Sequence, residues 1–249
     1  MSNTRIALIG DYNASLTAHI TISPALELAA KASNVDVEPV WIHTSYIEAD
    51  HQRRDTIIAF LRRNMVRTRP SLCERRRCNL RYIAGPHRRN PILRHVCWLP
   101  ARSNRVFQER DRYNQHSARR VESRSGTPLI SKLSYSFVEV NGTVRLISGS
   151  LSQRLSGTDR VEEDYRCNYG LNPEFAPLLH GRNDIRIEGT DDSGEVRIIR
   201  LQNHPFFIAT LFQPQRSALK GLVHPLIREF VSVSAYRSHG AFGAEQVAN

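Results

Sequence analysis

Long hydrophobic runs are missing from this sequence, and their absence excludes two classes of protein. No segment approaches the roughly 20 consecutive apolar residues that a membrane-spanning helix needs, so we expect no contact with a membrane. The apolar residues near the start, 6–9, are too few for the core of a secretory signal peptide. Cysteine is also scarce, since 4 residues among 249 do not make a disulfide framework. These absences together predict a cytoplasmic protein.

Lysine is absent from one long segment, in which arginine dominates. Between Arg53 and Arg124 there are 20 Arg, no Lys and 5 acidic residues, which gives a net charge of +15. The rest of the chain has a net charge of −4, although the whole chain carries +11. Such a block of positive charge is typical of nucleic-acid binding. Few aromatic side chains accompany it, so we expect any such binding to be non-specific.

The N-terminal part has the pattern of a parallel β-α-β unit. Apolar strands are predicted over residues 5–10 and 35–42, with a helix over 15–31 between them. Pro24 is compatible with the first turn of the main helix. A strand, a helix and a strand within about 40 residues are typical of an α/β protein. With 40% hydrophobic residues, the chain is long enough to bury a core.

The second half has the pattern of antiparallel strands. Residues 133–140 and 143–147 flank Asn141 and Gly142, a dipeptide that is typical of a tight hairpin turn. The other elements predicted here are strands over 195–201 and 206–212, a turn over 191–194, an amphipathic helix over 225–236 and a flexible tail over 237–249.

Residues 53–115 follow neither the strand period nor the helix period. Arginine pairs and triplets interrupt every apolar run, and prolines punctuate the stretch. We therefore predict an α/β fold with a mostly parallel central sheet, in which this middle segment is disrupted or poorly ordered.

Motifs on both sides of this stretch resemble one known family. In order and spacing they resemble motifs of the glutamine amidotransferase domain of CTP synthase, which is a class I glutamine amidotransferase. The resemblance covers about residues 1–45 and 127–236. Residues 6–12 resemble I-A-L-V-G-K-Y, 142–146 resemble G-T-M-R-L, 163–172 resemble E-R-H-R-H-R-Y-E-V-N, 204–207 and 212–215 resemble H-P-F-F and F-H-P-E, and 224–227 resemble H-P-L-F.

The resemblance implies one domain over residues 1–249, a class I glutamine amidotransferase-like sandwich. Residues 1–50 and 116–236 are its family-like parts, and 53–115 is the Arg-rich part. The implied ligand is glutamine or a related small molecule, and the implied reaction is glutamine hydrolysis that supplies ammonia for pyrimidine nucleotide synthesis. A separate synthase domain or subunit is the implied partner, and no cofactor is implied.

The residues at the catalytic positions depart from the family. Its glutaminase uses a Cys-His-Glu triad, in which a thiolate attacks glutamine, His transfers protons and Glu orients the His. Gln213 and Gln215 stand at the His and Glu positions, and a carboxamide cannot transfer protons near pH 7. The nucleophile elbow G-x-C-x-G is absent. Cys97 is the nearest thiol by position, but it lies between Val96 and Trp98 instead of glycines, so we expect an inactive chain.

Candidate substrate-binding residues lie in the segment 163–172. Arg166 and Tyr169 match residues of the family motif, whereas Asn168 stands where an Arg precedes the Tyr. Two further aromatic residues lie near Arg166 along the chain, namely Tyr165 and Phe175. The aromatic group forms either a stacking surface over the ligand pocket or part of the core, and the sequence leaves both open.

A shifted reading frame over residues about 61–115 explains why the elbow is missing. Read one base downstream, compatible codons for residues 89–113 can encode G-I-P-F-F-G-T-C-V-G-F-Q-H-A-V-I-E-Y-F-K-N-V-I-G, which contains it. Read the same way, residues 61–69 can encode F-D-G-I-W-C-V-P-G, which resembles the family's strand and following loop. Two constraints do not depend on codon choice. Met65 followed by Val66 forces the Trp of this strand segment, Trp98 forces a Gly in the elbow, and both fit. The shift also explains the arginine excess without a selected basic function.

The histidines and cysteines predict no metal site. The spacing of those in the middle stretch fits no common zinc module. His204 and His224 each precede a proline at the start of an element, which favours structural roles. Two alternatives to the amidotransferase interpretation stay open, a non-catalytic small-molecule-binding or regulatory relative and a basic nucleic-acid-binding protein. The residues weighed for zinc are Cys73, Cys78, His87, His95 and Cys97.

Overall fold

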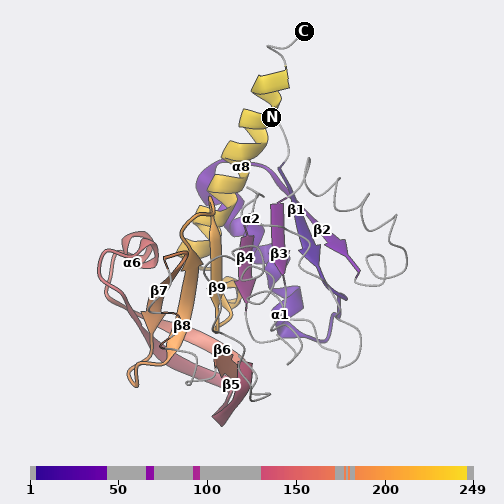
Figure 1. Cartoon of the computed structure of the whole chain (residues 1–249). Coiled ribbons are helices and arrows are strands. Elements are labelled where there is room, and N and C mark those ends of the chain that lie inside the picture. The colour runs from indigo at the N-terminus through magenta and orange to yellow at the C-terminus, as the bar shows by residue number, and fades with distance from the viewer. Residues whose placement is uncertain are drawn as a thin grey trace, which may run out of the picture.

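The computed structural model describes residues 4–43, 66–69, 92–95, 130–171, 177, 179 and 183–245. Within them lies a nine-stranded sheet in the order β2-β1-β3-β4-β9-β8-β7-β5-β6 (Figure 1). The parallel part comprises β1 (Thr4–Ile9), β2 (Val37–Ile42), β3 (Val66–Arg69), β4 (Ile92–His95) and β9 (Phe207–Thr210). The antiparallel part continues from β9 through β8 (Val196–Leu201), β7 (Ile185–Thr190), β5 (Ile130–Leu146) and β6 (Arg160–Leu171). The predicted α/β class with a mostly parallel central sheet is confirmed.

Most of the described helices are short, and two are longer. They are α1 (Thr17–Ile20), α2 (Ile22–Ser33), α6 (Leu151–Ser156), the 3₁₀ helix η2 (Pro214–Lys220) and α8 (Pro225–Glu245). The closing helix begins where the sequence predicts it and continues past the predicted end at residue 236. In the described ranges, no helix combines the length and the apolar character that a membrane span requires.

The predicted β-α-β unit is present, since β1 and β2 pair in parallel with the helices between them. The single helix predicted over 15–31 is wrong in one respect, because Thr21 separates α1 from α2. The Thr21 hydroxyl donates to the Thr17 carbonyl oxygen at 2.8 Å, and such bonding back to the preceding turn favours a bend. Pro24 lies in the first turn of α2, where a missing N–H is tolerated. Asn34, with a φ of 53°, ends α2 in the left-handed conformation.

The hairpin turn predicted at Asn141 and Gly142 is wrong. Both residues lie inside β5, opposite Asp164 and Glu163 of β6. A Cβ atom on Gly142 would lie 3.2 Å from Cε2 of Tyr165, so this glycine makes room for a buried ring and not for a turn. Asn141 Nδ2 donates to Asp164 Oδ1 at 3.2 Å. Cross-strand contacts therefore keep the chain extended where the local pattern predicts a reversal.

Two strands of the parallel part come from the Arg-rich stretch, for which the sequence predicts no element. β3 pairs with β1, and β4 lies between β3 and β9, with Ile92 opposite Phe207. Leu93 of β4 is buried. The other residues of 53–115 lie outside the described part of the chain, so a disrupted middle segment stays a prediction.

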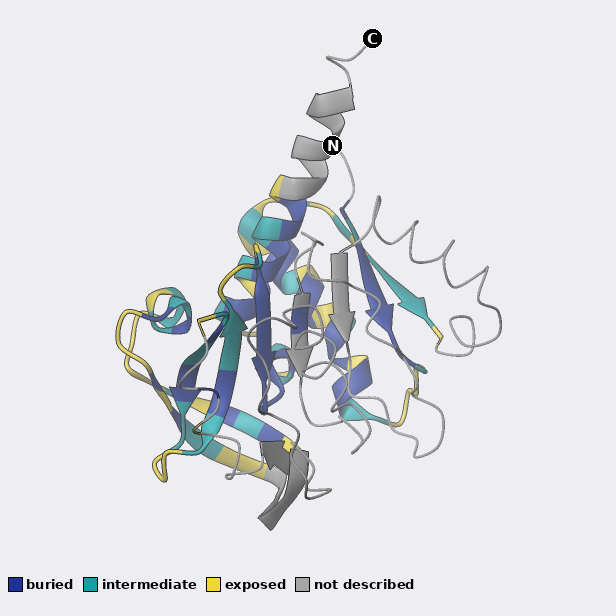
Figure 2. Cartoon of the chain, in the orientation of Figure 1, coloured by how far each residue is buried: buried dark blue, intermediate teal, exposed yellow. Residues whose placement is uncertain are grey.

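The core lies between the parallel strands and a helical layer in which α2 and α8 pack together (Figure 2). Ile6 and Leu8 of β1 and Ile208 of β9 are completely buried. Leu26 of α2 and Phe230 of α8 belong to the same hydrophobic cluster. Burial of large apolar side chains from both layers is the main contribution to the stability of this part of the fold.

Candidate functional site

The carboxyl ends of parallel strands meet at one edge of a sheet, and open α/β sheets bind their ligands there. Two residues that the sequence singles out lie directly after β9 at this edge. Gln213 precedes η2 and Gln215 lies in its first turn, and only 2% and 7% of their surfaces are exposed. Both carboxamides are therefore held inside the protein at the edge where a ligand is expected.

Gln213 lies where the antiparallel part of the sheet curls back on itself. β6 is the last strand of the sheet, yet its Asp164 carbonyl oxygen accepts a hydrogen bond of 3.0 Å from the Gln213 backbone N–H. We call this junction, formed by residues 163–165 and 211–215, the seam. The Phe212 ring makes an edge contact with the Tyr165 ring across it, with centroids 6.0 Å apart. The seam fixes the backbone of Gln213 against β6.

The two glutamine side chains differ in their hydrogen bonding. Gln215 Nε2 donates to the Ala18 carbonyl oxygen of α1 at 3.4 Å. Gln213 Oε1 is buried and has no hydrogen-bond partner among the described residues. The structure thus brings the loop after β9 against α1 through Gln215 and against β6 through Gln213. Chemically, the two carboxamides can donate and accept hydrogen bonds, but neither can act as a general base at neutral pH.

His224 attaches the start of α8 to the seam. Its Nδ1 accepts a hydrogen bond from the Leu226 backbone N–H at 3.1 Å, so the neutral ring carries its proton on Nε2. That nitrogen donates to Glu163 Oε1 at 2.9 Å. His204 similarly accepts from the Phe206 backbone N–H at 3.3 Å. Both histidines have the structural roles that the sequence predicts.

Sequence reasoning missed a third histidine, which lies near the carboxyl end of β1. His19 of α1 is 1% exposed, and its Nδ1 accepts from the Asn13 backbone N–H at 3.0 Å. Its ring lies beside those of Tyr12 and Trp41, at centroid distances of 6.2 and 5.4 Å. The spacing around His19 does not separate it from a surface residue of a helix, so the sequence holds no signal for its burial.

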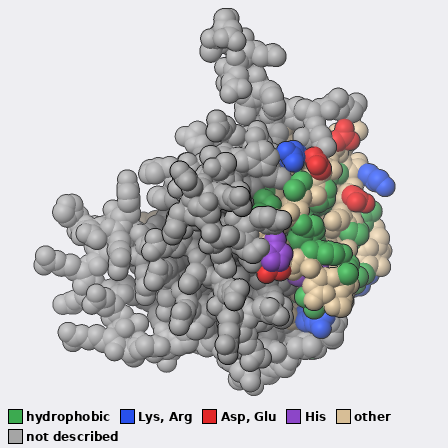
Figure 3. All heavy atoms as spheres, turned by 90° about the vertical axis from the view of Figure 1, so that its right-hand side faces the viewer, with side chains coloured by type: hydrophobic (Ala, Val, Ile, Leu, Met, Phe, Trp, Pro, Cys, Tyr) green, Lys and Arg blue, Asp and Glu red, His purple; other side chains and the backbone are tan. Residues whose placement is uncertain are grey.

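Figure 3 views the molecule from the β2 side. On this face hydrophobic side chains gather, and charged side chains and histidine lie at the border of the hydrophobic group.

The other site residues predicted from the resemblance are only partly described. Arg166 lies on β6 with an exposed side chain. Tyr169 and Asn168 also belong to β6, but their side chains lie outside the described part of the structure. Cys97 and Phe175 lie outside the described residues altogether. The roles assigned to these five residues stay predictions.

Tyr165 belongs to the core and does not form a stacking surface. It is 1% exposed, and burial raises the pKa of its phenol well above the ordinary value of 10.0. The Arg197 guanidinium lies 6.0 Å from the centre of its ring. Of the two interpretations that the sequence leaves open for Tyr165, core packing is therefore correct.

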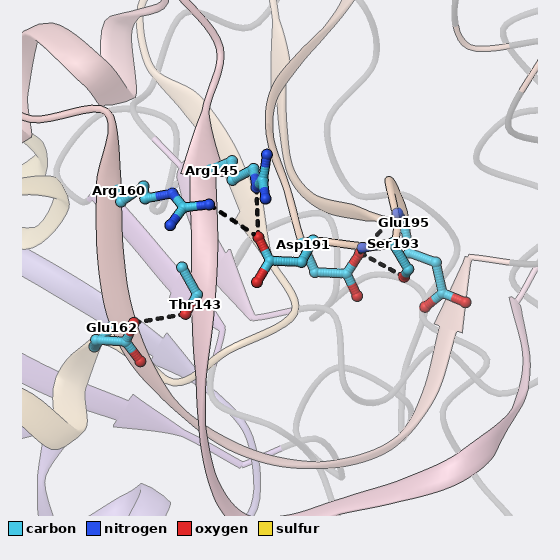
Figure 4. A network of polar contacts seen from close by, with 8 residues as sticks. Thr143, Arg145, Arg160, Glu162, Asp191, Ser193 and Glu195 are labelled. Atoms are coloured by element: carbon cyan, nitrogen blue, oxygen red, sulfur yellow. Dashed lines mark hydrogen bonds and ion pairs between the residues drawn. The ribbon is translucent and has the colours of Figure 1, made fainter.

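A polar network on β5 to β8 holds the turn that joins β7 to β8 (Figure 4). Asp191 Oδ1 accepts from the backbone N–H groups of Ser193 and Glu195 at 3.0 and 2.9 Å. Buried Arg197 forms ion pairs with Asp191 and Glu195. Burial alone would raise the pKa of Asp191, but the hydrogen bonds from Ser193 and Arg197 hold it below its ordinary value. Three outer contacts accompany it, those of Asp192 with Arg145 and with Arg160, and that of Thr143 with Glu162.

Nothing in the described ranges resembles a metal centre. There, no three side chains of His, Cys, Asp or Glu gather closely enough to hold a metal ion. The side chains weighed for zinc in the sequence lie outside the described part of the structure, namely Cys73, Cys78, His87, His95 and Cys97.

We expect acid to weaken the seam through Asp164. Burial alone would raise the pKa of this carboxyl group, but hydrogen bonds from Asn141 and Lys220 hold it below the ordinary value. A group whose pKa is lowered by folding stabilises the protein above its unfolded-state pKa, and this stabilisation is lost as the pH falls through the folded-state pKa. The difference in unfolding free energy between the wild type and Asp164→Asn should therefore be largest at neutral pH and shrink in acid. Urea denaturation over a series of pH values measures it, and a difference that does not change with pH would contradict the expectation.

Curated CTP synthases are similar to this chain over most of its length. That of Synechococcus sp. (strain CC9605) is 27% identical over 250 residues, which cover 94% of this chain and 44% of that protein. That of Sulfolobus acidocaldarius is 26% identical over 243 residues, covering 93% and 45%. That of Carboxydothermus hydrogenoformans is 35% identical over 104 residues, covering 39% and 19%. The chain thus spans less than half the length of these relatives, and no protein-family model matches it.

The fold also occurs in a solved structure of the glutaminase domain of Trypanosoma brucei CTPS with bound acivicin. That domain superposes with a TM-score of 0.70, and the match covers 94% of both chains. The sequence identity is 16%, so this likeness bears on the architecture of the mixed sheet and its helices.

Proposed function

We propose that this chain, a glutamine amidotransferase-like domain of the CTP synthase type, retains the glutaminase fold without hydrolysing glutamine. The observation that carries the proposal is the chemistry of two buried side chains. Gln213 and Gln215 stand where the family motif has His and Glu, at the carboxyl edge of the sheet.

The missing step is proton transfer. A cysteine thiol becomes a nucleophile when a base takes its proton, and the same group later protonates the departing ammonia. A carboxamide does neither at neutral pH, and Gln215 cannot support a positively charged imidazole as a carboxylate does. General acid–base catalysis by a positioned group contributes about 100- to 10,000-fold to a rate, and this contribution is absent.

Incubation of the protein with L-glutamine is expected to release no ammonia above the buffer background. An assay coupled to glutamate dehydrogenase measures the ammonia. The matched variant is Gln213→His combined with Gln215→Glu, which places the family's proton-transfer pair on the same backbone. Ammonia release by the wild type that is abolished by Cys97→Ala would contradict the proposal.

The Arg-rich stretch is proposed to be the product of a shifted reading frame, and not a selected basic surface. The support comes from the sequence, since Met65 and Val66 constrain the shifted codons over 61–69 to the Trp that the family's strand and following loop need, and Trp98 constrains those of the elbow to Gly. Sequencing the gene tests this directly. A continuous frame that encodes these residues beside intact flanks, without a shift, would contradict it.

A role in pyrimidine nucleotide synthesis would require a partner. The curated relatives are more than twice as long as the matched part, so a synthase domain or subunit is the partner that we propose for the reaction that consumes ammonia. Glutamine is the proposed ligand of the domain itself.

A non-catalytic ligand-binding domain is the second candidate function. One observation favours it, because Gln213 Oε1 is a buried acceptor without a partner among the described residues. Binding of glutamine without turnover, measured as thermal stabilisation, would support this candidate.

A further inference from the structure

We propose that Gln213 is a specificity-determining residue which recognises a primary carboxamide and rejects the corresponding carboxylate. This inference rests on the proposed function, because it concerns the ligand that an inactive site would retain. It names a role for the carboxamide that stands at a proton-transfer position.

Within the described part of the chain, one buried side-chain oxygen near the carboxyl edge of the sheet lacks a hydrogen-bond donor, namely Gln213 Oε1. Among the described residues, three uncharged side chains have a buried oxygen without a hydrogen-bond partner, those of Thr4, Ser152 and Gln213. Thr4 begins β1 at the opposite edge of the sheet, and Ser152 lies in the first turn of α6. Gln213 alone of the three follows the carboxyl end of a parallel strand, where ligands bind in sheets of this class. Because buried polar groups are almost always hydrogen-bonded, we expect a buried oxygen without a partner at this edge to accept a hydrogen bond from a ligand.

The backbone that carries this acceptor is fixed before any ligand arrives. The Gln213 backbone N–H is bonded to Asp164 of β6, and the neighbouring Phe212 ring packs against Tyr165. Two residues further on, Gln215 is bonded to Ala18 of α1. An acceptor held by its neighbours loses little conformational entropy on binding, so a hydrogen bond made there is selective.

A primary carboxamide supplies the N–H donor that Gln213 Oε1 lacks among the described residues. Each amide offers one carbonyl acceptor and an NH₂ donor, so two amides can pair through two hydrogen bonds. A carboxylate offers acceptors only. It has no hydrogen to donate to Gln213 Oε1, which therefore stays unpaired. The buried polar group left unpaired is what makes the site reject the acid.

The test compares L-glutamine with L-glutamate, which differ only at this group. Calorimetric titration of the full chain is expected to give a dissociation constant about tenfold or more lower for glutamine. Ammonia is assayed in the same samples. Hydrolysis would refute the proposed function, whereas equal affinity for the two ligands, or no measurable binding of glutamine, would refute the role of Gln213 and leave the inactivity proposal standing.

Gln213→Leu separates recognition from structure. Leucine has a similar volume and removes the unmet acceptor, so the ligand-free variant should melt at the same temperature as the wild type or above it. Its preference for glutamine over glutamate should fall to about twofold or less. Gln202→Leu, on an exposed turn after β8, is the matched control and should keep the preference. A variant Gln213→Leu that keeps the full preference, or that melts lower without ligand, would overturn the proposal.

Discussion

Arg197→Met is expected to lower the free energy of unfolding by about 3–5 kcal/mol, since it breaks a buried ion pair from one side. The Arg197 side chain is 1% exposed and pairs with Asp191 and with Glu195, the latter at 2.8 Å. Its guanidinium also lies over the buried Tyr165 ring. Methionine replaces the apolar stem but leaves the Asp191 carboxylate without its main cation. That carboxylate organises the turn between β7 and β8, so the loss should spread to both strands.

Urea denaturation followed by circular dichroism measures this effect. Arg145→Met is the matched control, because the ion pair between Arg145 and Asp192 is more than half exposed on both sides. Exposed pairs contribute about 0–1 kcal/mol, so the control should stay close to the wild type. Equal losses in the two variants would show that burial of Arg197 does not govern its contribution.

Glu188→Ala is expected to be the second large loss, about 2–4 kcal/mol. The Glu188 carboxylate is completely buried and accepts hydrogen bonds of 2.8 Å from Arg200 Nε and from the Ser152 backbone N–H. The second bond ties the first turn of α6 to β7. Alanine leaves both donors without their acceptor, although Arg200 is partly exposed and can regain water. The expected cost therefore lies below that for Arg197.

Two measurements separate the contributions of Glu188. Thermal unfolding of Glu188→Gln should show a smaller loss than that of Glu188→Ala, because the amide oxygen still accepts from Ser152. Amide hydrogen exchange in α6 should accelerate in the alanine variant and change little in the glutamine variant. Equal exchange rates in α6 for all three proteins would contradict the role of Glu188 in holding this helix.

Local sequence patterns were sufficient to predict an element wherever that element depends only on its own residues. The apolar run of β1 and the turn before β8 follow from residue types at short spacing, and the structure confirms both. The same local logic failed at Asn141 and Gly142. There the requirement of Tyr165 for space on the facing strand outweighs the turn preference, and a residue 23 positions away carries that information.

The candidate site likewise has features that follow from local sequence and features that depend on distant segments. The sequence by itself determined which chemistry is missing, because a carboxamide at position 213 or 215 cannot move a proton in any fold. Only the tertiary structure decided that Gln213 is buried with an unmet acceptor, that β6 returns to the loop after β9, and that His19 is enclosed. Proton affinity is a property of one side chain, whereas burial and hydrogen-bond pairing depend on which distant segments meet.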